Sequence, residues 1–165
     1  MLTLHETPTT IQDYLDSEGV LYERIPHHRD YSAQQAAADT HTPGHAFAKT
    51  VVMRVGNNRA LIVIPADHRI DFAKLARALN VEPLCLADEA EMVRLFPDCE
   101  LGAEPPLGLL YNVPVYVSSA LRDAPSLTFN AGTHEEAIRI SYEDFERINR
   151  CPTIIDCSVK VSEEA

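Results

Sequence analysis

Residues 47–65 read FAKTVVMRVGNNRALIVIP, two apolar runs separated by a short polar segment. β-Branched residues dominate both runs, which is typical of strands rather than helices. The pair Asn57-Asn58 after Gly56 tolerates the positive φ of a tight turn, so the pattern predicts a hairpin of strands Phe47–Val55 and Arg59–Pro65. Apolar side chains alternate to both faces of the second strand, which indicates a sheet covered on both sides.

The segments around this hairpin predict a mixed α/β fold. Small polar side chains that can cap a helix stand at four places: Thr9 or Thr10, Ser32, Asp71 and Asp88. Helices are expected over residues 11–18, 33–38, 72–79, 89–96 and 142–149. Short apolar runs predict strands at residues 20–25, 115–118, 127–130 and 137–141, and an added edge strand within residues 153–161.

Length and composition predict one domain that covers residues 1–165. Hydrophobic residues make up 45% and charged residues 24% of the chain, which argues against a disordered protein. The longest unbroken apolar stretch, Ala60–Ala66, is far shorter than the roughly 20 residues that a membrane-spanning helix needs. No secretory signal is visible either, so a cytoplasmic protein without membrane attachment is expected.

The balance of charges argues against a general nucleic-acid binder. Lys and Arg number 14 against 25 Asp and Glu, for a net charge of −11, which disfavours adhesion to DNA and to anionic lipid. A nucleic-acid partner must therefore be recognised at a local site. The 4 cysteines show no CxxC spacing, so reduced thiols are expected rather than a zinc ribbon or a disulfide scaffold.

Lys49 is the first candidate for chemistry. In a regular strand it shares one face with Phe47, Val51 and Met53, which places an ammonium in an apolar row. Such a lysine has two interpretations. Either it lines a cleft, where it could donate to a carbonyl or carboxylate or act as a base, or it is an ordinary strand-end lysine whose stem reaches water.

Two loops are further candidates. Within the loop expected at Leu101–Pro114, residues 102–108 read GAEPPLG, where prolines fix the backbone and glycines permit close approach. This loop could present the amides of Gly102 to Glu104 to a carbonyl oxygen, or be an ordinary rigid connection. Residues 130–134, NAGTH, predict a loop of small residues ending in the ionisable His134, which could equally be a surface histidine.

Metal ligands are not evident in the sequence. His41 and His45 have the spacing of a helical metal pair, but Pro43-Gly44 between them opposes a helix, and adjacent His27 and His28 point to opposite sides of an extended chain. GxSxG, P-loop and GxGxxG motifs are also missing. Catalysis is therefore expected to need no protein-bound metal and no cofactor.

Taken in order, three segments resemble the bacterial YbaK family, also called the prolyl-tRNA synthetase-associated or insertion domain. They are residues 46–53 with their hairpin partner 60–66, residues 102–108, and residues 129–134. The resemblance covers about residues 9–150 and leaves 151–165 as a C-terminal extension. It implies one α/β domain around a mixed, barrel-like sheet, and an enzyme that hydrolyses the ester between a wrong amino acid and tRNA.

The resemblance also implies roles for individual residues. Lys49 matches the family's essential strand lysine, and Gly102 with Pro106 matches its GxxxP loop, which includes Ala103. Thr50 is similar to the residue after the lysine in cysteinyl-tRNA editors. Gly132 and His134 are similar to positions in alanine editors. Catalysis by Lys49 and Gly102 and substrate binding by the other five residues are the expected roles, with the amino acid open among Ala, Cys, Ser and Thr.

The implied partners are the acceptor end of aminoacyl-tRNA, with tRNA-Pro as a candidate, and an aminoacyl-tRNA synthetase. Candidates for a local basic rim that could meet the tRNA phosphates are Arg29, Arg54, Arg69 and Lys74. The alternative is a non-catalytic binding module that keeps this fold and recognises a small ligand or a protein, because a fold does not determine a function.

Overall fold

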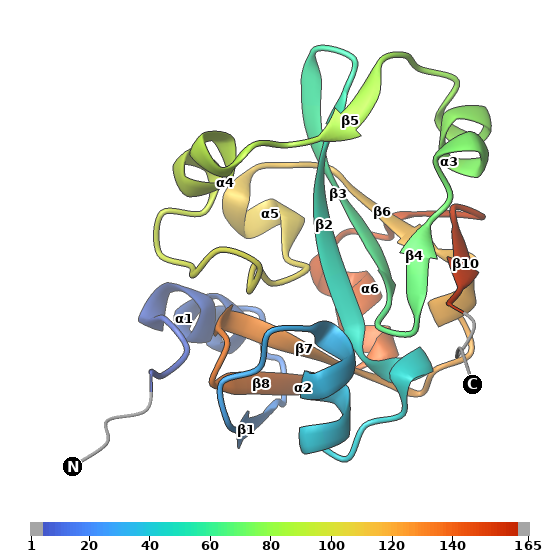
Figure 1. The fold of residues 1–165 in the computed structure, drawn as a ribbon. Helices are drawn as coiled ribbons and strands as arrows, with labels where there is room; N and C mark the ends of the chain where they lie inside the picture. Colours follow the sequence, from blue (N-terminus) through green and yellow to red (C-terminus); the bar gives the residue numbers. More distant parts are fainter. Residues whose placement is uncertain (1–4, 162–165) are drawn as a thin grey trace.

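A computed structural model describes residues 5–161 and shows the mixed α/β fold that the sequence predicts (Figure 1). The helices are α1 Thr9–Ser17, α2 Ala33–Asp39, α3 Phe72–Leu79, α4 Glu89–Leu95, α5 Gly108–Tyr111 and α6 Tyr142–Ile148. The strands are β1 Glu23–Pro26, β2 Ala48–Val55, β3 Asn58–Pro65, β4 His68–Ile70, β5 Leu84–Leu86, β6 Val115–Ser118, β7 Ser126–Thr133, β8 Glu136–Ser141, β9 Thr153–Ile155 and β10 Ser158–Lys160. Within the described range, every helix is too short or too polar to cross a membrane.

The predicted hairpin is confirmed as the antiparallel pair β2 and β3. Their register runs from Ala48 opposite Pro65 to Val55 opposite Asn58. The prediction that the asparagines take the positive φ was wrong, because Gly56 takes it instead, with φ 62°. Glycine has no Cβ to collide with the backbone in this conformation, so it adopts the turn at the lowest cost.

The strands divide into three sheets. The five-stranded sheet has the order β5-β2-β3-β6-β9 and is mixed, because β6 pairs parallel with both β3 and β9. A three-stranded sheet has the order β1-β8-β7, and β10 pairs with β4. The expected mixed sheet is thus confirmed, although these strands do not close into a barrel. The C-terminal segment adds the edge strand β9, as predicted.

Local capping signals account for most helix starts. Three predicted caps accept a hydrogen bond from the backbone N–H three residues later: Ser32, Asp71 and Asp88. The expected cap at Thr9 or Thr10 was wrong, because Pro8 stands at the N-cap of α1 and makes no side-chain cap. The expectation of a loop throughout Leu101–Pro114 was also wrong, because it contains α5.

The β2–β3 hairpin is buried on both faces, as its sequence predicts. On one face Val52 and Leu61 pack with Phe96, and on the other Met53 and Ile62 pack in a second cluster. A third and larger cluster joins α1 and α6 to the sheet that contains β7 and β8. The hairpin therefore forms a rigid wall against which a site can be built (Figure 1).

Candidate functional site

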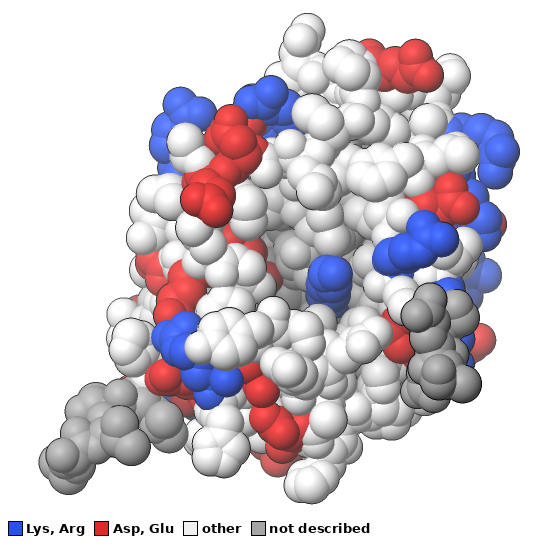
Figure 2. Space-filling view, viewed as in Figure 1, with Lys and Arg blue, Asp and Glu red and all other residues white. Residues whose placement is uncertain are grey.

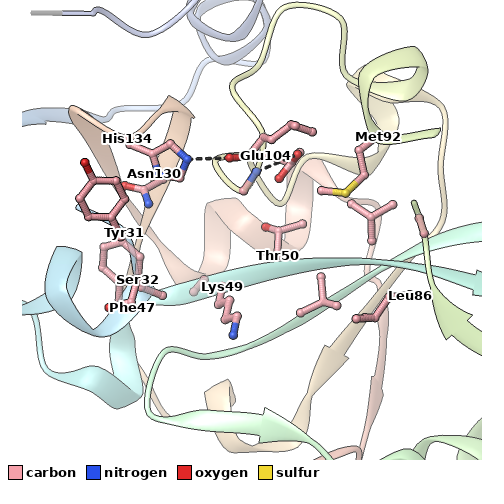
Figure 3. A pocket seen from close by; sticks show the side chains of 17 residues that line it. Tyr31, Ser32, Phe47, Lys49, Thr50, Leu86, Met92, Glu104, Asn130 and His134 are labelled. Atoms are coloured by element: carbon pink, nitrogen blue, oxygen red, sulfur yellow. Dashed lines mark hydrogen bonds between the residues drawn. The ribbon is translucent and has the colours of Figure 1, made fainter. Parts of the chain in front are cut away.

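A pocket of about 620 Å³ opens beside the N-terminal half of β2. Figure 2 shows a hollow near the middle of this face, with uncharged residues along most of its wall. The three segments singled out in the sequence meet here: Lys49 and Thr50 come from β2, Gly102 from the proline-rich loop, and His134 from the turn after β7 (Figure 3). The volume is in the range of ordinary small-molecule sites.

One wall of the pocket is the edge of β2 at Thr50, between the bridge of Phe47 with Thr128 and the start of β5, where no strand pairs with β2 among residues 5–161. β5 pairs with β2 only at residues 53–55, and the Val52 carbonyl accepts a hydrogen bond from Ala87 at 3.0 Å on that same side. Backbone groups of an antiparallel strand alternate in direction, so the N–H and C=O of Thr50 also face this edge. The pocket can therefore offer backbone hydrogen bonds to a ligand.

Lys49 and Thr50 extend to opposite sides of β2 (Figure 3). The Lys49 side chain is exposed and makes no ion pair within residues 5–161. The Thr50 hydroxyl is buried and finds no hydrogen-bond partner in the same part of the chain. The ammonium is thus open to a ligand at the rim, and the hydroxyl is a buried polar group without a partner among the described residues.

The amides of the Gly102 loop are largely engaged within the protein. The N–H of Gly102 donates to Glu104 Oε1 at 3.2 Å, and the N–H of Ala103 donates to the carbonyl of Glu100 at 3.0 Å. The resting loop therefore differs from the expected arrangement, in which these amides are open to a substrate carbonyl. The reason is that the loop folds back and satisfies its own buried donors.

His134 ties this loop to the end of β7. Its Nε2 donates to the carbonyl of Leu101 at 2.6 Å, and its backbone N–H donates to Glu100 Oε1 at 2.8 Å. A Cβ added to Gly102, which has φ +86°, would lie 3.3 Å from His134 Cε1. Glycine at this position thus allows the close approach of loop and imidazole.

Three other predicted site residues lie beside the pocket rather than in its wall. Ala103 and Pro106 are buried in the loop. Residues 130–133, expected as a loop, form the irregular end of β7, where a Cβ on Gly132 would come within 2.7 Å of Pro8. Their positions support the loop and the strand end, and their contact with a substrate stays a prediction.

The most notable side chain that the sequence did not single out is that of Glu104. Its side chain lines the pocket although the residue is only 4% exposed, and burial raises the pKa of its carboxyl. A glutamate before Pro105 in a loop is ordinarily a solvated charge, so only its position inside the GxxxP segment could have drawn attention to it.

A second unanticipated group stands behind Asn130, another pocket residue. His27 Nε2 lies 3.2 Å from Asn130 Oδ1, and His27 Nδ1 lies 2.6 Å from the carbonyl of His28 and 3.0 Å from Asp30 Oδ2. Together with Asp39, His27 and Asp30 bring possible metal-binding atoms within 4.8 Å of one another. Both ring nitrogens of His27 already have partners within the protein, and we interpret the group as a support for Asn130.

Glu100 links the loop to the β7–β8 turn electrostatically. Partial burial alone would raise the pKa of Glu100, but hydrogen bonds from Arg29, Thr133 and the His134 amide outweigh it and lower the pKa to about 2. The shortest of these contacts joins Arg29 Nη2 to Glu100 Oε2 at 2.5 Å. The ionised carboxylate therefore stabilises the folded site.

This linkage predicts a pH-dependent contribution to stability. Because the folded pKa of about 2 lies below the ordinary value of 4.5, the contribution is complete above the ordinary value and is lost as the pH falls through about 2. Urea unfolding of wild type and Glu100→Gln should show a stability difference that shrinks over this acid range. Parallel curves for the two proteins would show that Glu100 is not held in this way.

Comparison with known proteins connects this geometry to a family. Residues 27–148 match the family model described as the aminoacyl-tRNA editing domain. A protein described provisionally as a trans-editing enzyme for prolyl tRNA synthetase superposes with a TM-score of 0.80 at 21% identity, over 97% of this chain and 100% of that one. No curated protein sequence matches significantly.

Two further solved structures share the fold. One is a scaffold protein used for the grafting of linear epitopes, with TM-score 0.80, 20% identity and coverage of 93% of this chain and 97% of that one. The other is a hypothetical protein, with TM-score 0.78, 19% identity and coverage of 91% and 99%. At such identities a structural likeness establishes the fold alone.

The family model is the more informative match, because it spans well over half of the chain. It includes Lys49 on β2, the Gly102 loop and His134, the three elements that meet at the pocket. The resemblance drawn from the sequence motifs is thereby confirmed, and the chain belongs to the family of aminoacyl-tRNA editing domains, the YbaK family.

Proposed function

We propose that the protein is a trans-editing hydrolase that removes a small, wrongly attached amino acid from tRNA. In this reaction water attacks the ester carbonyl carbon, the bond from that carbon to the ribose oxygen breaks, and the ribose oxygen leaves with a proton. The observation that carries the proposal is the convergence of Lys49, Thr50, Gly102 and His134 on one pocket in a chain of the editing family.

The available donors suggest how the ester is held. The exposed Lys49 ammonium at the rim orients or polarises the aminoacyl group, and the Thr50 N–H on the open edge of β2 donates to the carbonyl oxygen. This assigns to β2 the part first expected of the amides of Gly102 to Glu104, of which those of Gly102 and Ala103 are engaged within the loop. The terminal ribose hydroxyl helps to activate water, and His134 shapes the wall.

The apolar part of the pocket suits a small, uncharged side chain. Phe47, Ala48 and Val52 give the pocket an apolar surface along β2 and the residue before it. Editing by size is needed because binding discriminates one methylene by only about 1–3 kcal/mol. Alanine, cysteine, serine and threonine are the candidates. The neighbour described as acting for prolyl tRNA synthetase makes tRNA-Pro the first tRNA to test, in the cytoplasm where charged tRNA is found.

The surface charges support a weak, local contact with tRNA. Three of the four basic residues expected at a rim are already paired: Arg29 with Glu100, Arg54 with carboxylates of α4 and its cap, and Lys74 with Asp156. Basic and acidic side chains are interspersed on the face drawn in Figure 2. A synthetase that supplies further affinity is therefore a proposed partner.

The salt dependence of tRNA binding should be shallow. Each phosphate contact contributes about 0.7 to 0.9 to the slope of log affinity against log salt, so a few contacts at the acceptor end give a small slope. Filter binding or fluorescence titration across salt concentrations measures it. A tight complex whose slope corresponds to about six or more phosphate contacts would contradict this prediction. It would require a basic surface larger than the paired charges leave open.

A panel of mischarged tRNAs tests the proposed function. We expect release of free amino acid from a tRNA that carries Ala, Cys, Ser or Thr, and little release from correctly charged Pro-tRNA. The same rate is expected after chelation of any protein-bound metal, provided that the Mg²⁺ required by the tRNA is held constant. Hydrolysis of none of these substrates would contradict the proposal and favour a non-catalytic binding module.

A further inference from the structure

The pocket contains a buried carboxylate with an unsatisfied oxygen. Glu104 Oε1 accepts the Gly102 N–H at 3.2 Å, whereas Glu104 Oε2 is buried and has no hydrogen-bond partner within residues 5–161. The Thr50 hydroxyl is also buried and unpartnered in that range, and it points from β2 toward Glu104 (Figure 3). Two acceptors of one pocket thus lack a donor.

The charge of Glu104 also lacks a partner. None of the lysines and arginines in the described chain forms an ion pair with it, and the nearby His134 uses its Nε2 proton on the carbonyl of Leu101. A buried carboxylate without a counter-charge is costly, and here burial raises its pKa. A cationic donor that entered the pocket would relieve both the unpaired charge and the unpaired oxygen.

We propose that Glu104, with Thr50, binds the α-ammonium of the aminoacyl group, so that the substrates are esters whose α-amino group is free. An ammonium carries three donors on one compact centre, which suits a carboxylate oxygen and a hydroxyl that line the same pocket. Glu104 is thereby a specificity-determining residue. The inference rests on the proposed function, because it assigns one part of the same substrate.

This assignment explains the hydrogen bond that the Gly102 amide makes to Glu104. Its hydrogen bond to Oε1 fixes the orientation of the Glu104 carboxylate and leaves Oε2 for the ligand. Gly102 then acts on the substrate through Glu104, while the carbonyl oxygen of the ester is left to the β2 edge. The ammonium is in this way held by Glu104 and the Thr50 hydroxyl, and the carbonyl of the same aminoacyl group by the Thr50 N–H.

A binding experiment tests the inference without any need for catalysis. Chemical-shift titrations compare L-alaninamide, which has a free ammonium, with N-acetyl-L-alaninamide. Wild type should bind the free amine about tenfold more tightly or better, as expected for a charge-assisted hydrogen bond. Glu104→Gln, which keeps the shape and removes the charge, should lose this preference, and Glu104→Asp should retain part of it.

Glu136→Gln is the matched control. Glu136 is likewise 4% exposed but pairs with Arg24 and does not line the pocket, so its variant should keep the preference for the free amine. Circular dichroism verifies that each variant is folded. Equal binding of the two amides by wild type, no binding of either, or a preference that persists in Glu104→Gln would overturn the inference.

Hydrolysis assays separate this inference from the proposed function. N-Acetylation of the mischarged tRNA should slow wild type about tenfold and leave the already slower Glu104→Gln nearly unaffected. Wild-type hydrolysis that is insensitive to N-acetylation would refute the role of Glu104 while the editing function stands. If wild type prefers the amide with a free ammonium but hydrolyses no tRNA, the role of Glu104 stands and the proposed editing function is refuted.

Discussion

Lys49→Ala is expected to lower the rate of aminoacyl-tRNA hydrolysis by about 100-fold or more, the scale for loss of one well-placed electrostatic group. The side chain is exposed at the pocket rim and makes no ion pair within the described residues, so its removal should leave the free energy of unfolding unchanged. Single-turnover hydrolysis and urea unfolding of the same preparation measure the two quantities.

Two further variants identify the cause of such a loss. Lys49→Arg should remain impaired, because a planar guanidinium cannot occupy the position of a compact ammonium. Lys160→Ala is the matched control, since Lys160 is likewise an exposed lysine, lies on β10 and does not line this pocket. Near wild-type turnover by folded Lys49→Ala would eliminate Lys49 from the reaction.

Local signals made much of the fold predictable. Ser32, Asp71 and Asp88 act as caps through hydrogen bonds to residues three positions away, so the neighbouring sequence is sufficient to predict them. The hairpin is similarly local, because the register of β2 and β3 follows from a tight turn between two apolar runs. Only the residue with positive φ was assigned wrongly, and there Gly56 has the intrinsic advantage over asparagine.

Elements that depend on distant partners could not be predicted in this way. Strands β4 and β10 have three residues each and pair across the chain, with Ser158 opposite Ile70, so neither has a pattern of its own. The single turn of α5 lies in a segment whose prolines and glycines favour a loop. Its N-terminal Gly108 is held by Asn149, which lies 41 residues further along the chain.

The candidate site shows the same division. Lys49, Gly102 and His134 stand in motifs that resemble a family, and the structure brings them to one pocket. The Glu104 side chain carries no signal of its own although it lies in the segment 102–108, because its importance comes from burial and from the partner that Oε2 lacks, and neither is visible in a loop sequence. Position within a motif therefore indicated where the site lies, whereas the unusual electrostatics of the site could be recognised only from the folded structure.

Asn149→Ala is expected to lower the free energy of unfolding by roughly 2–4 kcal/mol. Asn149 is 8% exposed and lies just after α6. Its Oδ1 accepts the Gly108 N–H at 3.0 Å, and its Nδ2 donates to the carbonyls of Pro106 and Phe145 at 3.0 and 3.1 Å. Alanine would leave the buried Gly108 N–H and Pro106 carbonyl without this partner, and buried unsatisfied groups cost about 1–3 kcal/mol each.

The variant should also disturb the pocket, because the segment that Asn149 holds continues directly from Gly102 and Glu104. Asn149→Asp should not restore stability, since a carboxylate keeps the acceptor for Gly108 but turns its negative charge toward two carbonyl oxygens. Asn57→Ala, at an exposed position in the hairpin turn, is the control and should change stability little. Urea unfolding measures all three, and a loss below about 1 kcal/mol in Asn149→Ala would mean that α6 does not anchor the loop.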